Sequence, residues 1–363
     1  MRIEAAVICG DGVGPEMMGP ALSVLKTVCE TYHHEWRLHP VCACSEALEQ
    51  GKGPLPEESL KICLSVPAVL FGNTGLKKYA DQPLSQRPEG ALMELRKALG
   101  VTTNIRPVRA YPELAEFSPL KKEVLERGLD FAFVRDIEGG VLCSDKVSQE
   151  GKYGREAYEY EYYNEKIVRD TAHIAMKLAE SRRKKVANLD KSNVLASSRL
   201  WRQTVGQVAR EYPEIELSHY YIDNAAMRIL ESPHEFDVFV TSNLFGDIIS
   251  DEGTQMTGTA YLYGSAEISR DGHAIYTPNQ LHHPDESIIG RQVVNPIGMI
   301  SAVALMFRFS FGLEREAQAI EGAIGQVIRD GMATKDIWTL GKVLLGTEEI
   351  GEAVCEKVKR LKN

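Results

Sequence analysis

The sequence has no apolar run long enough to cross a membrane and no excess of positive charge. A membrane-spanning helix needs about 20 consecutive apolar residues, so we do not expect a membrane protein. The formal net charge of −9 and the isoelectric point near 5.6 have the wrong sign for nucleic acid or an anionic membrane as the main partner. The 363 residues, 44% of them hydrophobic, suffice for one large or two medium domains.

Cysteine pairs of the kind that bind zinc or form redox motifs are also missing. Of the seven cysteines, Cys42 and Cys44 are separated by a single residue, and no second pair has zinc-finger spacing. Reduced, buried thiols in a cytoplasmic protein are therefore the simplest interpretation.

A Rossmann fingerprint is missing too, although the N-terminal segment at first suggests one. Residues 5–10 read as a strand and residues 11–18 turn into a helix. Pro15 stands where G-x-G-x-x-G requires its third glycine, so the fingerprint fails, and the proline fits the first turn of a helix instead. Further along, apolar strand-like segments alternate with amphipathic helical ones, which predicts an α/β fold.

Segment 243–251 carries two carboxylates four residues apart, directly after the apolar, β-branched segment 236–241. The first part predicts a buried strand and the second a helix on which Asp247 and Asp251 share one face. They repel each other there unless a cation lies between them, and their oxygens suit Mg²⁺ or Mn²⁺. The alternative is a helix that begins with acidic residues because its dipole favours them.

Other charged side chains adjoin apolar runs. Arg96, Arg106 and Arg135 come from three separate elements, and three planar guanidinium groups can hold a di- or tricarboxylic acid. Lys191 ends a predicted strand and is a candidate general base. Unrelated surface arginines and a solvated lysine remain the alternatives. Tyr163 is one of five tyrosines between residues 153 and 163, so the pattern singles out none of them.

Seven motifs follow one another along nearly the whole chain, at residues 10–16, 88–96, 104–107, 134–140, 190–195, 223–227 and 243–251. Together they resemble the β-decarboxylating dehydrogenases, the family of the 3-isopropylmalate, isocitrate, homoisocitrate and tartrate/malate enzymes. The resemblance implies two α/β domains with a central cleft and no standard Rossmann domain. Residues 1–102 plus 260–363 would form a discontinuous first domain on the cofactor side. Residues 103–259 would form the second domain, which carries the substrate, the metal and the dimer contact.

The resemblance also implies a homodimer with shared active sites and assigns roles within them. The arginines that bind the substrate carboxylates correspond to Arg96, Arg106 and Arg135. The ligands of Mg²⁺ or Mn²⁺, a Lewis acid at the C2 oxygen, correspond to Asp223, Asp247 and Asp251, with Asp223 from the partner subunit. Lys191, also from the partner, takes the proton of the C2 hydroxyl. Tyr163, with Tyr162 as the fallback, protonates the enol carbon after CO₂ leaves.

Substrate choice in the family is read at the helix that contains Arg96. Leu92 and Met93 are expected to face the site there, and Val194 adds to an apolar wall. Burying a third carboxylate against such a wall would cost several kcal/mol, which favours an alkyl substituent. We therefore expect the oxidative decarboxylation of 3-isopropylmalate or a close analogue, as in leucine biosynthesis.

The cofactor loop, residues 277–295, departs from the family pattern. The resemblance assigns NAD binding to Thr74, Glu89, Asp285 and Asn295, and a carboxylate at Asp285 favours NAD over NADP because it repels a 2′-phosphate. The family's His-Gly-Ser-Ala has become residues 280–283, and two residues are inserted before Gly290. Leu281 adds a side chain where glycine allows close backbone approach. His282 and His283 are new cofactor contacts, a metal pair or plain exposed histidines.

Two further hypotheses follow from this altered loop. The chain is a paralogue that acts on a different 2-alkylmalate, or it is a non-catalytic or regulatory homologue that binds the acid and the metal and has lost the dinucleotide. The presence of Tyr163, Lys191 and the three aspartates favours catalysis.

Overall fold

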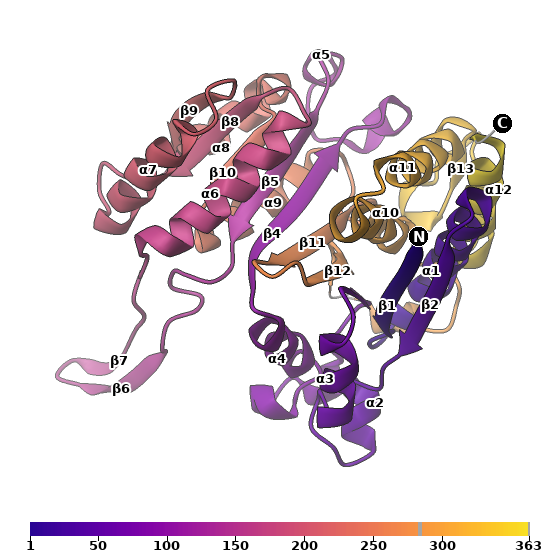
Figure 1. Ribbon diagram of the computed structural model, residues 1–363, viewed down its shortest axis with the longest axis horizontal. Helices are drawn as coiled ribbons and strands as arrows, with labels where there is room; N and C mark the ends of the chain where they lie inside the picture. Colours follow the sequence, from indigo (N-terminus) through magenta and orange to yellow (C-terminus); the bar gives the residue numbers. More distant parts are fainter. Residues whose placement is uncertain (282–284, 362–363) are drawn as a thin grey trace. The chain divides into compact units, whose positions relative to one another are not determined.

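The computed structural model describes residues 1–281 and 285–361, which form two compact units (Figure 1). Unit 1 comprises Met1–Val101, Tyr111–Phe117 and Gly258–Asn363, and unit 2 comprises Thr102–Ala110 and Ser118–Thr257. The crossings that the sequence predicts, at residues 102 and 260, lie close to two of these boundaries. Strands and helices alternate along the chain, so the predicted α/β class is confirmed.

Unit 1 is built on strands in the order β2–β1–β3–β12–β11. Strand β1 pairs in parallel with β2 and β3, β12 pairs in parallel with β3, and β11 runs antiparallel to β12. The strands of unit 1 are β1 (Arg2–Ile8), β2 (Glu35–Pro40), β3 (Ala68–Phe71), β11 (Gly264–Ser269) and β12 (Ala274–Pro278), with a separate small pair of β13 (Met332–Ala333) and β14 (Val343–Leu344).

Helix α10 (Ile297–Phe311) is the core helix of unit 1 because it is buried along most of its length. It packs against β11, β12, α1 and α11, and α12 packs against α1 and α11 (Figure 1). Pro15 lies in the first turn of α1, as the sequence predicts, and Gly100, which has φ +61°, follows the last residue of α4. The other helices of unit 1 are α1 (Gly14–Tyr32), α2 (Cys44–Glu49), α3 (Glu57–Leu64), α4 (Gly90–Leu99), α11 (Glu314–Arg329) and α12 (Thr347–Leu361).

Unit 2 has strands in the order β4–β5–β10–β8–β9. Strands β5, β10, β8 and β9 are parallel to one another, and β4 is antiparallel to β5. Phe133 of β5 and Phe239 of β10 stack in the core with ring centroids 4.8 Å apart. The strands are β4 (Val101–Arg109), β5 (Asp130–Asp136), β8 (Lys185–Asp190), β9 (Glu216–Tyr221) and β10 (Val238–Thr241).

The helices of unit 2 pack on this sheet, and one hairpin projects from it (Figure 1). Helix α6 starts where the Asn164 side chain accepts a hydrogen bond from the Ile167 amide at 3.0 Å, and its apolar stripe faces β5 and β10. The helices are α5 (Lys122–Leu125), α6 (Glu165–Glu180), α7 (Ala196–Ala209), α8 (Ile222–Glu231) and α9 (Asn243–Gln255). The projecting hairpin consists of β6 (Val147–Gly151) and β7 (Gly154–Tyr158).

Short 3₁₀ turns complete both units, at Lys77–Tyr79, Leu84–Gln86, Pro112–Phe117, Pro233–Glu235, Glu286–Ile288 and Lys335–Ile337. All seven cysteines have free thiols, but the predicted burial holds for only four of them, because Cys9 and Cys143 are exposed and Cys42 is half-buried. Within residues 1–281 and 285–361, no helix combines the length and the apolar character that a membrane span requires.

Candidate functional site

The predicted site residues of unit 2 gather where its parallel strands end. Arg135 lies at the end of β5, Lys191 follows β8, Asp223 follows β9, and Asn243 begins α9 just after β10. Because these four strands are parallel, their carboxyl ends lie on the same edge of the sheet. Ligands of open α/β sheets bind at this edge, so it is the candidate functional site of unit 2.

Arg135 is the centre of the first cluster at this edge. Its side chain is nearly buried and donates to Asn243 Oδ1 from Nε at 3.1 Å and from Nη2 at 2.8 Å, while Nη1 donates to Asp247. Gly246 makes this possible, because a Cβ there would lie 2.7 Å from Cγ of Arg135 and 2.8 Å from Cγ2 of Thr241. The first turn of α9 therefore rests directly on the arginine.

Arg106 of β4 forms the second cluster with the next turn of α9. Its Nη1 donates to Asp251 Oδ1 at 2.9 Å and to the Ser250 hydroxyl at 2.8 Å, and its Nε donates to Asn104 Oδ1 at 2.9 Å. The arginine side chain is only 12% exposed, whereas that of Asp251 is 69% exposed. Each carboxylate on the exposed face of α9 thus has its own guanidinium partner, which reduces the repulsion that the spacing predicts.

The donor set on α9 fits a hard divalent cation in kind, but not in number. Asp247 and Asp251 are exposed carboxylates on one helix face, as predicted, and Mg²⁺ prefers such oxygens. Among the described residues of one chain, no three acidic, histidine or cysteine side chains come together as a metal site.

Lys191 and Asp223 form a separate pair. The ammonium Nζ donates to Asp223 Oδ2 at 2.7 Å and lies 5.9 Å from the centroid of the Tyr221 ring. This hydrogen bond holds the pKa of Asp223 below its usual range. The side chain of Asp223 is 63% exposed. The two residues that the resemblance assigns to the partner subunit are thus presented together at the surface of one chain.

Tyr163 is 7% exposed and contacts Asn243, the residue that also binds Arg135. Its hydroxyl accepts a hydrogen bond from the Asn243 amide at 2.8 Å, and its ring lies where a Cβ on Gly139 would clash. Burial raises the pKa of the Tyr163 phenol, and burial raises the pKa of Asp136 to about 6. Tyr162, the fallback, is 60% exposed. The hydroxyl of Tyr163 thus positions Asn243, and its role as a proton donor remains a prediction.

Leu92 and Met93 of α4 were expected to face the site together, but their side chains point in different directions. Leu92 is 2% exposed and Met93 is 45% exposed, because neighbours on a helix point in different directions. Val194 is 63% exposed, in unit 2. Arg96 is engaged by the buried Glu267 of β11, a partner that the sequence did not suggest.

The altered loop packs on the glycine-containing turn after β3. The Thr74 amide donates to the Leu281 carbonyl at 2.9 Å, and Asn73 Nδ2 donates to the Gln280 carbonyl at 3.2 Å. The Thr74 hydroxyl donates to Asp11 Oδ2 at 3.3 Å. Of the other predicted cofactor residues, Asp285 accepts from the Ser287 amide at 2.9 Å, and Asn295 caps α10 through the Ile297 amide at 3.0 Å. His282 and His283 lie outside the described residues.

The hydrogen-bonding groups of these residues suit a dinucleotide, but the cavity beside them is small. Glu89 Oε2 and Asn73 Oδ1 are buried without a hydrogen-bond partner within the described ranges, so both can receive a ligand's donors. The cavity between Asn73, Gly12, Asp285 and Ile289 has a volume of only about 10 Å³. That is room for roughly one water molecule. This cavity alone is too small for a dinucleotide.

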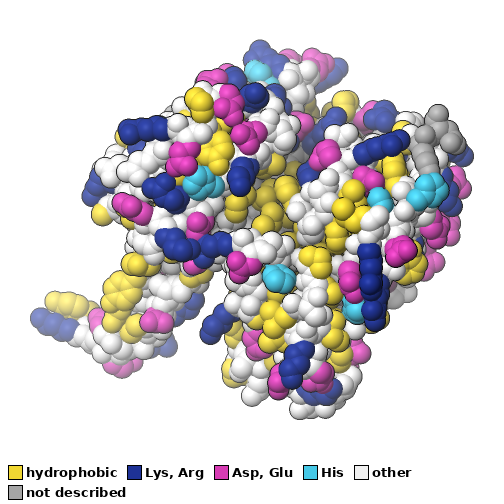
Figure 2. Space-filling model, viewed as in Figure 1, with side chains coloured by type: hydrophobic (Ala, Val, Ile, Leu, Met, Phe, Trp, Pro, Cys, Tyr) yellow, Lys and Arg dark blue, Asp and Glu magenta, His cyan; other side chains and the backbone are white. Residues whose placement is uncertain are grey.

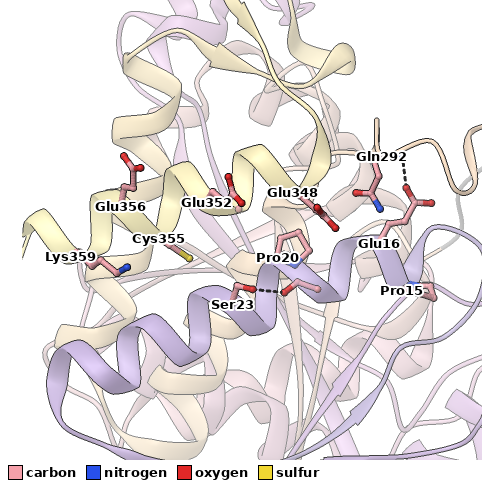
Figure 3. A pocket seen from close by; sticks show the side chains of 12 residues that line it. Pro15, Glu16, Pro20, Ser23, Gln292, Glu348, Glu352, Cys355, Glu356 and Lys359 are labelled. Atoms are coloured by element: carbon pink, nitrogen blue, oxygen red, sulfur yellow. Dashed lines mark hydrogen bonds between the residues drawn. The ribbon is translucent and has the colours of Figure 1, made fainter.

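A roomier cavity of about 550 Å³ lies between α1 and α12 (Figure 3). Its walls carry Glu16, Glu348, Glu352 and Glu356, with Lys359 as a basic residue. Glu16 already accepts hydrogen bonds from the Gly290 and Gln292 amides. Because like charges repel, this acidic cavity is unsuited to a dicarboxylic acid and is not the candidate site.

Comparisons with known proteins agree with these observations. Residues 4–354 match the family described as isocitrate/isopropylmalate dehydrogenase. A 3-isopropylmalate dehydrogenase of Clostridium acetobutylicum is 41% identical over 98% of this chain and 99% of the relative. One from Helicobacter hepaticus is 40% identical over 99% of this chain and 100% of the relative. The crystal structure of isocitrate dehydrogenase from Methylococcus capsulatus has a TM-score of 0.83 at 26% identity, and the match covers 98% of this chain and 99% of that one.

The family match, the near-complete coverage of the relatives and the shared fold all lead to one assignment. The chain belongs to the isocitrate/isopropylmalate dehydrogenase family.

Proposed function

We propose that this chain catalyses the metal- and NAD-dependent oxidative decarboxylation of a 2-hydroxy-3-alkyl dicarboxylic acid, with 3-isopropylmalate as the best candidate. The relatives that match nearly end to end carry the name 3-isopropylmalate dehydrogenase. They give no support to a non-catalytic homologue. The observation in the structure that carries the proposal is the pairing of two arginines with the aspartates of α9. Arg135, near the end of β5, pairs with Asp247, and Arg106, within β4, pairs with Asp251.

This pairing suits an acid that binds through a carboxylate and a metal at once. Arg106 and Arg135 are held by Asn104 and Asn243, so they need little reorganisation when the substrate binds. Each also contacts one of the two aspartates of α9, which fixes the spacing between the anion-binding groups and the predicted metal ligands. Arg96 belongs to unit 1, and its part in binding the same acid stays a prediction from the resemblance.

The residues of the chain then share the chemistry as follows. The partner subunit's Lys191 receives the proton of the C2 hydroxyl at Nζ, and the C2 hydrogen leaves as hydride. The resulting β-keto acid loses CO₂, and a protein acid protonates the enol carbon. Asp247 and Asp251, with the partner subunit's Asp223, would hold Mg²⁺ or Mn²⁺, and Thr74, Glu89, Asp285 and Asn295 would hold NAD. When bound, the metal supplies a Lewis acid for the C2 oxygen and NAD accepts the hydride.

The active unit in this proposal is a homodimer, because each chain presents two incomplete halves of a site. One half is the arginine–aspartate cluster of α9, and the other is the Lys191–Asp223 pair. Helices α8 and α9, which carry Asp223, Asp247 and Asp251, also expose the apolar side chains of Met227, Leu230 and Ile248, and exposed apolar surface favours association.

The projecting hairpin of β6 and β7 supports the same assembly. Both strands are exposed almost throughout, and an isolated two-stranded hairpin is only marginally stable in water. Figure 2 shows hydrophobic side chains along this arm, and Tyr153, Tyr158, Tyr160 and Tyr162 are all exposed. A second chain would cover this surface.

The direct test is an assay of the purified chain. We expect NADH and CO₂ to form in equal amounts from 3-isopropylmalate, NAD and Mg²⁺ or Mn²⁺. Replacing 3-isopropylmalate by isocitrate, or NAD by NADP, should lower kcat/KM by at least about tenfold. The predicted apolar wall disfavours the additional carboxylate of isocitrate, and the Asp285 carboxylate disfavours the 2′-phosphate of NADP. Tighter binding of NADP than of NAD would contradict the prediction that the Asp285 carboxylate repels the 2′-phosphate of NADP. Binding of the acid without any NADH would point to the non-catalytic homologue.

Mixed dimers test whether the active sites are shared. Lys191→Ala and Asp251→Asn damage opposite halves, so each variant alone should be nearly inactive. After random exchange in an equal mixture, half of the dimers contain one of each chain, and each of these has one intact site. Activity should therefore recover to about a quarter of the wild-type value if the sites follow two-fold symmetry. No recovery, with exchange verified by differently tagged chains, would place each site within a single chain.

Tyr163→Phe separates the two roles of this tyrosine. The substitution removes the hydroxyl that accepts a hydrogen bond from the Asn243 amide. A positioning role therefore predicts a lower melting temperature and a raised KM with kcat largely kept. A fall in kcat of about 10² or more at unchanged KM would instead establish Tyr163 as the proton donor. Tyr162→Phe, at an exposed neighbour, is the control and should leave the melting temperature and KM unchanged. If only Tyr162→Phe lowers kcat, Tyr162 is the proton donor.

A further inference from the structure

Asp136, the last residue of β5, is a buried carboxylate that the proposed chemistry leaves unused. Its side chain is completely buried, and no lysine, arginine or histidine of the described residues forms an ion pair with it. The buried carboxylates of Asp190, Asp237 and Glu267 differ, because each of them has an arginine partner. A buried charge without a cationic partner is costly, so the contacts that Asp136 does make are informative.

Those contacts are with backbone amides of the turn that follows β5. Asp136 Oδ2 accepts a hydrogen bond from the Gly139 amide at 2.8 Å, and Oδ1 accepts one from the Glu138 amide at 3.3 Å. An aspartate side chain that binds backbone amides shortly after it in the sequence stabilises a tight turn. Gly140 completes this turn with φ +78°, a conformation that favours glycine. The carboxylate of Asp136 thus fixes the turn of residues 137–140.

The same turn holds the side chain of Asn243. The Gly139 carbonyl accepts a hydrogen bond from Asn243 Nδ2 at 2.9 Å. With Nδ2 held there, Oδ1 of the same amide group faces Arg135 and accepts from both Nε and Nη2. A continuous path of hydrogen bonds therefore leads from the Asp136 carboxylate through Gly139 and Asn243 to the Arg135 guanidinium.

We propose that Asp136 is a positioning residue, whose ionised carboxylate holds the turn of residues 137–140 and, through Asn243, orients the guanidinium of Arg135. Adjacent residues of a strand point to opposite faces, so Asp136 acts on Arg135 by way of the turn. It touches no reacting atom itself. This inference rests on the proposed function, because it concerns the orientation of an arginine of that same site.

The charge of Asp136 changes in a pH range that can be tested. Burial raises the pKa of Asp136 from its usual value of 3.8 to about 6, although the amides of Gly139 and Glu138 lower it. Above this pH both oxygens are acceptors. A carboxyl group that gains a proton loses part of this acceptor capacity, because one oxygen becomes a donor. The turn should therefore hold Asn243 less firmly as the pH falls through about 6.

Few other titratable groups act on Asp136. The charge of Glu138, in the same turn, raises the pKa of Asp136. The Tyr163 phenol and the Cys143 thiol interact with Asp136 from neighbouring segments, but burial raises the pKa of both, so they stay protonated near pH 6. Strand β4 places the uncharged Thr103 opposite Asp136. Glu138 is therefore the residue that a control variant has to address.

Kinetics of Asp136→Asn distinguish positioning from a merely structural role. With 3-isopropylmalate, NAD and Mg²⁺ at about pH 8, we expect KM to rise about tenfold with kcat within a few-fold of wild type. The ratio of the two KM values should fall toward one below about pH 6, because the wild type then loses the same charge. Glu138→Gln, at an exposed side chain of the same turn, should keep the wild-type pH profile. A ratio that does not vary with pH would overturn the proposal.

The Nε–H resonance of Arg135 in ¹H–¹⁵N spectra tests the same path without any ligand. Its assignment follows from its absence in Arg135→Lys. In the wild type we expect its chemical shift to titrate with a midpoint near pH 6, as it should in Glu138→Gln. In Asp136→Asn the titration should disappear. If Asp136→Asn does not fold, Asn243→Ala interrupts the path at its middle and should abolish the titration as well.

This measurement separates the inference from the proposed function. If the wild-type chain forms no NADH from 3-isopropylmalate, the proposed function fails, and the Arg135 resonance still decides the role of Asp136. A resonance that titrates in the wild type and not in Asp136→Asn supports the proposal. A resonance that does not titrate in the wild type, or that titrates equally in Asp136→Asn, would overturn it.

Discussion

The interaction on which the rest of the candidate site depends is the contact of Arg135 with the first turn of α9. A guanidinium at the end of β5 is fixed by the side chain of Asn243 and reaches Asp247, and only glycine at position 246 leaves room for it. The Tyr163 hydroxyl accepts a hydrogen bond from the Asn243 amide and so fixes Asn243 as well. Through this arrangement, the packing of strands and helix sets the place of an anion-binding group and of a predicted metal ligand together.

The same arrangement divides the predicted site residues of unit 2 into two clusters. Arg106 and Arg135 take up the charge of the aspartates on α9, while Lys191 and Asp223 neutralise each other as a separate exposed pair. Both half-sites are stable without a ligand because each charge has a partner. A substrate and a metal would compete with these pairs in the proposed function.

The features of the fold and the site that depend on local spacing along the sequence were predictable. The four-residue interval of Asp247 and Asp251 predicted a shared helix face, and Pro15 predicted the start of α1. The pairing of Arg96 with Glu267 was not predictable, because residues so far apart in the sequence carry no local signal of their contact. The hydrogen bond between Thr74 and Leu281 was missed for the same reason. Leu92 and Met93 were placed on one face although neighbours on a helix diverge.

The central claim is that the aspartates of α9 and Asp223 bind one divalent cation between two chains. Titration of the wild-type chain with Mn²⁺ in the presence of 3-isopropylmalate, followed by electron paramagnetic resonance, tests it most directly. The account predicts one bound Mn²⁺ per chain and an affinity that falls at least about tenfold in both Asp223→Asn and Asp251→Asn. Binding that Asp223→Asn leaves unchanged would contradict the account.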